Sequence, residues 1–192
     1  MSGGGPRRVA PACRPALASP GRLPGSHRTT HGREVAIEIA WGLLLWAGFV
    51  ATLAVSWLAA VARWTGLTRL EPALLLGCLV LARADGVLTR VAGAVLYLLC
   101  GVVLLPAVYG AAFEALQRAD ALIGMLFGAV QAVAAGLGLD LIGRWGPCPR
   151  LGAAGSPGLF GWRLGAFTPA ALVVAHLFYG ALLGFVYVVP GR

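Results

Sequence analysis

Long apolar stretches alternate with short polar segments along most of this chain. Four stretches contain no charged residue: 39–62, 91–113, 121–139 and 164–189. A helix needs about 20 apolar residues to cross the hydrocarbon of a bilayer, because it rises 1.5 Å per residue. Each stretch meets that length, and none shows the polar face of a helix on a soluble protein. The pattern predicts an all-α fold, a polytopic transmembrane bundle with four spanning helices.

A fifth apolar stretch, at about 70–82, is too short to cross a bilayer as a helix. Pro72 suits the first turn of a helix, where its missing N–H has no partner to lose. We therefore expect a half-helix between the first two spans, either interfacial or re-entrant. The alternative is a fifth span with Arg69 and Arg83 reaching outward to water. Length favours four spans, whereas the distribution of arginines favours five.

Composition agrees with residence in a membrane. Hydrophobic residues make up 59% of the chain and charged residues 11%, and the mean hydropathy is +0.83. In soluble domains, roughly 45–50% of the residues are hydrophobic and about 25% are charged. The net charge of +8 comes from 15 basic residues, all of them Arg. They flank the apolar stretches, where they meet water and lipid headgroups. The bilayer is therefore the expected partner, and nucleic acid is not.

The first 34 residues differ from the rest. This segment, 1–34, is rich in Gly, Pro, Ser and Arg and lacks apolar periodicity, so we expect a disordered tail before a transmembrane domain at 35–192. The Ala, Gly and Arg bias without Lys resembles the product of a GC-rich prokaryotic gene. The expected location is the prokaryotic cytoplasmic membrane.

Small residues recur every fourth position in three of the spans and predict close helix packing, because helices in lipid associate where backbones can approach. We expect the third helix to be central and Pro106 to kink the second. Tryptophans near the helix ends are expected to act as interfacial anchors. The packing positions are Gly48, Thr52, Gly124, Gly128, Ala132, Gly136, Gly180 and Gly184, and the anchors are Trp41, Trp64, Trp145 and Trp162.

Two polar residues fall at mid-depth in their spans. Gln131 lies in the third span and His176 in the fourth. Polar groups at that depth usually face protein, and an ionisable one is a candidate functional group. One hypothesis is a hydrogen bond between the two side chains, worth about 0.6 kcal/mol. The other is a proton or substrate site, since histidine titrates near neutral pH.

Motifs for catalysis, metal or cofactors are missing from the sequence. There is no HExxH, CxxC, G-x-S-x-G, P-loop or dinucleotide fingerprint. Cys78 and Cys100 lie in apolar stretches and are expected to serve as small hydrophobic residues. We expect no enzymatic activity, no metal and no cofactor.

The order of motifs resembles an uncharacterised family of small prokaryotic membrane proteins, a domain of unknown function with four helices. The resemblance covers about residues 40–188 and implies membrane residence and the fold, but no established activity. Histidines often stand in that family where this chain has Arg90, Gln131 and Cys148, which weakens any inherited metal or proton role. The matching positions are Gly48-Phe49-Val50-Ala51-Thr52, Gly66-Leu67, Leu76-Gly77, Gly124 to Gly136, Pro149-Arg150, His176-Leu177-Phe178-Tyr179-Gly180, Gly184 and Tyr187.

Two functions fit these features. The first is a non-catalytic structural or accessory bundle that associates with a membrane-protein partner or with its own copies. The alternative is a small transporter or channel-like component that uses the polar site around His176 and Gln131. A dry, sealed contact between these two side chains would favour the first function, and a water-filled cavity at His176 would favour the second.

Overall fold

A computed structural model describes Met1 and residues 31–83, 86–147 and 156–187; side chains are described from residue 41 onward. This part of the chain contains helices and no strand, which confirms the all-α prediction. The expected disordered tail lies mostly outside the described residues. Its last four residues, 31–34, form the start of the first helix. The helices are α1 (His31–Trp64), α2 (Pro72–Leu81), α3 (Val87–Leu99), a π-helical turn (Cys100–Leu104), α4 (Leu105–Leu116), α5 (Ala121–Trp145), a short 3-10 segment (Leu159–Leu164) and α6 (Thr168–Val186).

Four of the described helices are long and apolar enough to cross a membrane, as predicted. They cover Trp41–Trp64, Val87–Leu116, Ala121–Trp145 and Thr168–Val186. The second combines α3, the π-helical turn and α4 in one continuous helix. The helix α2 has 10 residues, or about 15 Å. It is therefore the expected half-helix and not the fifth span of the alternative.

The ends of the spans differ from the charge-free stretches. The helix α5 continues past Asp140 to Trp145, because the Asp140 carboxylate pairs with Arg144 one turn later at 2.7 Å. It begins after Asp120, whose carboxylate accepts the Ile123 N–H at 2.9 Å. That hydrogen bond and the adjacent Arg118 guanidinium hold the pKa of the Asp120 carboxyl below its usual range.

The last helix, α6, begins later than the sequence suggests. Leu164 belongs to the 3-10 segment, and Gly165 follows with a φ of 147°, a backbone angle that interrupts helical geometry. Pro169 then stands in the first turn of α6, which starts at Thr168. The expected boundary at 164 is therefore wrong by four residues.

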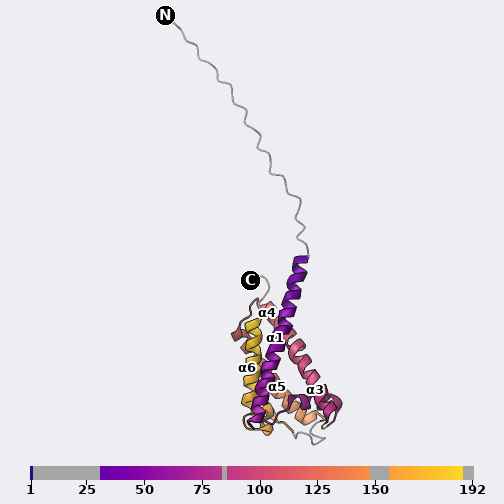
Figure 1. The fold of residues 1–192 in the computed structure, drawn as a ribbon. Coiled ribbons are helices and arrows are strands. Elements are labelled where there is room, and N and C mark those ends of the chain that lie inside the picture. Colours follow the sequence, from indigo (N-terminus) through magenta and orange to yellow (C-terminus); the bar gives the residue numbers. More distant parts are fainter. Residues whose placement is uncertain (2–30, 84–85, 148–155, 188–192) are drawn as a thin grey trace.

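The helices form a bundle (Figure 1). The contacts between helices make α6 its central member. It packs along α5 on one side and along α1 on the other, and it also touches α4. The prediction that the third span, α5, would be central is wrong. Gly180 and Gly184 bring α6 against α5, whereas Tyr179 and Leu183 face the buried cluster formed with α1 and α4. One helix with two packing faces takes the middle position.

Two glycines allow the half-helix α2 to pack closely against α3. A Cβ at Gly77 would overlap the carbonyl of Thr89, and a Cβ at Gly93 would overlap the carbonyl of Ala73. The two backbones are therefore in direct contact. Glu71, just before α2, forms an ion pair with Arg90 of α3 at 3.5 Å. These contacts hold α2 beside the bundle at the end where α1 finishes.

Candidate functional site: a cavity within the helical bundle

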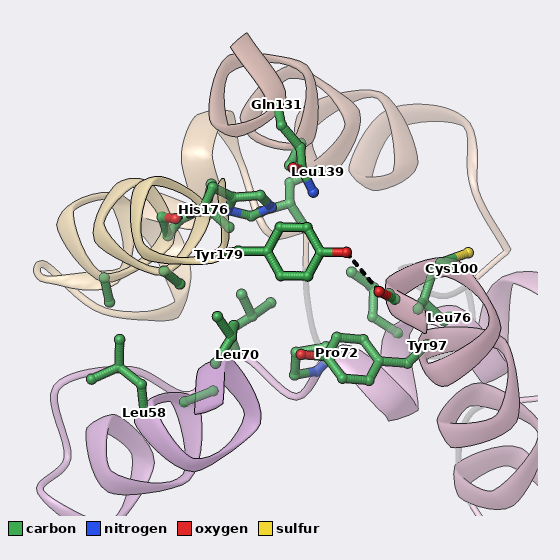
Figure 2. Close-up of a pocket in the computed structure, with 18 of the residues that line it drawn as sticks. Leu58, Leu70, Pro72, Leu76, Tyr97, Cys100, Gln131, Leu139, His176 and Tyr179 are labelled. Atoms are coloured by element: carbon green, nitrogen blue, oxygen red, sulfur yellow. Dashed lines mark hydrogen bonds between the residues drawn. The ribbon is translucent and has the colours of Figure 1, made fainter. Parts of the chain in front are cut away.

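A cavity of about 380 Å³ lies between the helices. Side chains from α1, α2, the α3–α4 helix, α5 and α6 surround it, and Figure 2 shows residues from these helices converging on one space. Its volume falls in the range of small-molecule sites, about 300–1,000 Å³. The lining residues are Thr52, Val55, Leu58, Ala59, Ala62, Thr68, Leu70, Pro72, Leu75, Leu76, Tyr97, Cys100, Gly101, Leu105, Gln131, Ala135, Gly138, Leu139, Ile142, Thr168, Ala171, Leu172, Ala175, His176 and Tyr179.

The wall of the cavity is mostly aliphatic. Among the described residues that line it, none is Asp, Glu, Lys or Arg. Two polar side chains of the wall bind each other, because the Thr68 and Thr168 hydroxyls form a hydrogen bond at 2.8 Å. Gln131 and His176 are directed toward the space beside Tyr179 in Figure 2. An apolar wall with a few convergent polar groups is typical of a binding site for a small molecule.

Tyr179 lies at the centre of the site, beside a carbonyl of the α3–α4 helix that has no backbone N–H to bind. In the π-helical turn, the Leu105 N–H binds the carbonyl of Cys100. The carbonyl of Gly101 would then accept from residue 106, which is a proline and has no N–H. The Tyr179 hydroxyl donates to this carbonyl at 2.6 Å. The residue expected to kink the helix, Pro106, therefore sits beside a π-helical turn, and Tyr179 satisfies the carbonyl left over.

His176 lines the cavity and is half-buried. Its Nδ1 lies 2.7 Å from the carbonyl oxygen of Leu172. Its own carbonyl faces Gly128 of α5. The backbone of this residue thus belongs to the α5–α6 contact, while the imidazole opens onto the cavity.

Gln131 lines the same cavity but has a partner that we did not expect. Its Oε1 accepts a hydrogen bond from the Tyr109 hydroxyl at 2.7 Å. The expected hydrogen bond between His176 and Gln131 is not found among the described residues. Both side chains line the cavity, and no hydrogen bond between them seals it.

Sequence reasoning missed the two central tyrosines. Tyr109 is 4% exposed, and its ring contacts those of Phe113, Phe127 and Tyr179. The signal available in the sequence was the position of Tyr109 and Tyr179 inside charge-free stretches, where a hydroxyl requires a protein partner.

The small residues line the seams that shape the cavity. A Cβ at Gly124 or Gly180 would overlap the other glycine's carbonyl, and one at Gly184 would overlap that of Asp120. Gly136 is covered by the Phe160 ring rather than by α6. On the other side of the bundle, Gly48 meets Pro106, and Thr52 meets Gly101. All eight expected packing positions are buried: Gly48, Thr52, Gly124, Gly128, Ala132, Gly136, Gly180 and Gly184.

The four tryptophans expected as anchors are exposed and stand at or near helix ends. Trp64 and Trp145 end α1 and α5, Trp162 lies in the 3-10 segment before α6, and Trp41 begins the apolar part of α1. Such positions suit side chains that sit at the headgroup level.

The cysteines and carboxylates give no metal site in the part of the chain that is described. Cys78 is buried in the hydrophobic core, where a small hydrophobic residue was expected, and it is also disulfide-bonded. Cys100 carries a free thiol and lines the cavity.

Replacing Tyr179 by Phe removes the donor to the Gly101 carbonyl and keeps the ring. We expect the variant to fold and to lose about 1 kcal/mol of stability, because a buried acceptor loses its partner. The measurement is urea or SDS unfolding in mixed micelles. As a control, Tyr97→Phe removes only a hydroxyl that receives a 3.3 Å contact from Ser56, so its loss should be smaller. Equal losses would contradict the special role of Tyr179.

Comparison of the chain with protein-family models, with curated proteins and with solved structures found no match.

Proposed function

We propose that this chain is an integral, multi-pass membrane protein that binds a small, uncharged and largely apolar molecule in the cavity between its helices. The observation that carries the proposal is the cavity of about 380 Å³ with His176 and Gln131 in its wall. A purely structural bundle would gain stability by filling this space, because the side chains that border a void lose packing contacts there.

The residues that line the cavity determine which class of molecule can bind there. Aliphatic side chains from five helices favour an apolar body. A charged occupant would leave water for a low-dielectric space with no opposite charge among the described lining residues, which costs several kcal/mol. An uncharged molecule with an apolar body avoids this cost.

Binding, without catalysis, is the activity proposed. Small apolar molecules cross lipid bilayers unaided, so retention or delivery of such a molecule is a better fit than flux of an ion. We place the protein in a prokaryotic cytoplasmic membrane on the basis of its Ala-, Gly- and Arg-rich composition without Lys. In this proposal a membrane-protein partner or a second copy receives the bound molecule.

The test is photolabelling of the full chain in lipid nanodiscs by decanol that carries a diazirine in its alkyl chain. Gly138 lines the cavity, and a Cβ there would meet nothing within 4 Å. We therefore expect Gly138→Phe to fold and fill the cavity, and to lower labelling of cavity-lining peptides about tenfold.

The matched control is Gly42→Phe on α1, where a Cβ also meets nothing within 4 Å but which does not line the cavity. This variant should keep full labelling of the cavity. Equal labelling of the wild type and Gly138→Phe, or labelling of lipid-facing positions alone, would overturn the proposed function.

A further inference from the structure

His176 presents a hydrogen-bond acceptor to the cavity. Its Nδ1 lies 2.7 Å from the Leu172 carbonyl oxygen. A carbonyl can only accept, so the proton of the neutral ring is on Nδ1. The other ring nitrogen, Nε2, then carries a lone pair.

Gln131 presents a donor. Its Oε1 accepts from the Tyr109 hydroxyl, which leaves the two N–H groups of the side-chain amide. No hydrogen bond to this nitrogen, or to Nε2 of His176, is found among the described residues. No buried polar side-chain atom of this part of the chain lacks a partner. The two nitrogens are therefore not sealed inside protein, and in Figure 2 the side chains are directed toward the same part of the cavity.

We infer that the ligand carries, at one end of an apolar body, a neutral polar group that both donates and accepts a hydrogen bond. It donates to Nε2 of His176 and accepts from the Gln131 amide. Alcohols, primary amides and undissociated carboxylic acids have this pairing, whereas ethers, esters and ketones lack the donor. This inference rests on the proposed function and adds the class of polar group.

The test is competition against the photolabel by three unlabelled probes, compared at equal mole fraction in the nanodisc lipid. Decanol donates and accepts. Its isomer nonyl methyl ether only accepts, and decane does neither. For the wild type we expect decanol to displace the label at about tenfold lower mole fraction than the ether, and the ether to be more potent than decane.

Two variants separate the two contacts. His176→Phe keeps a ring of similar size and should remove the difference between decanol and the ether. Gln131→Met keeps a linear side chain and should remove the difference between the ether and decane, while decanol remains better than the ether. The wild-type series stands by itself if either variant fails to fold.

Each outcome decides between the two proposals. If all three probes displace the label equally, the inference about the polar group is overturned and the proposed function stands. If the order of potency persists in folded His176→Phe, the acceptor is not His176 and the inference also falls. If no probe displaces the label and Gly138→Phe labels like the wild type, both proposals fall.

Discussion

Leucine at Gly128 is expected to abolish most of the folded protein recovered in detergent. A Cβ at this position would overlap the His176 carbonyl oxygen and lie 3.0 Å from the Cα of Leu177. These are backbone atoms of α6, which cannot rotate away as a side chain can. The helices α5 and α6, which share the most extensive contact among the described helices, must separate. We expect a cost of about 3 kcal/mol, the upper end of the usual range for overpacking. The measurement is the monodisperse fraction after size-exclusion chromatography, together with thermal stability.

The matched control lies on the same helix. Gly138→Leu is the same substitution in α5, but a Cβ there would meet nothing within 4 Å, and we expect near-normal recovery. A loss in Gly138→Leu as large as that in Gly128→Leu would point to a general intolerance of α5 to leucine. Normal recovery of Gly128→Leu would contradict the described α5–α6 contact.

Leucine at Gly93 is expected to release the half-helix α2 from α3. A Cβ at Gly93 would overlap the Ala73 carbonyl and lie close to the backbone nitrogen of Gly77. Because α2 also supplies Pro72, Leu75 and Leu76 to the cavity wall, photolabelling of the cavity should fall several-fold. The same substitution should make α2 sensitive to protease in nanodiscs.

The control for this substitution is Gly42→Leu, which places the same side chain in open space on α1. It should leave both labelling and protease resistance unchanged. If Gly93→Leu behaves like Gly42→Leu, then α2 is not held by the two glycines, and the wall of the cavity at that end has been assigned to the wrong segment.

The apolar stretches were sufficient to predict the helices, because length and the absence of charge decide whether a helix can lie in hydrocarbon. They could not predict helix ends, which depend on local groups such as the Asp140–Arg144 pair and the positive φ of Gly165. The stripe of small residues in α5 indicated close packing but not the neighbour. Whether a helix is central depends on how many of its faces are used, and α6 uses two.

The site could be predicted only in part. The depth of His176 and Gln131 in their spans marked them as unusual, and both line the cavity. Their relation could not be read from spacing, because the partner of Gln131 is Tyr109, on another helix. The role of Tyr179 depends on a π-helical turn next to Pro106, and no residue pattern distinguishes that turn from an ordinary proline kink.

The central claim is that the bundle is hollow beside His176 and Gln131, and xenon tests it most directly because xenon enters apolar cavities. The measurement is methyl NMR of alanine-labelled protein under xenon pressure. Ala59, Ala135 and Ala175 line the cavity, so their signals should shift with xenon in the wild type and should not in Gly138→Phe. Identical xenon responses of these three methyl groups in both proteins would contradict the claim.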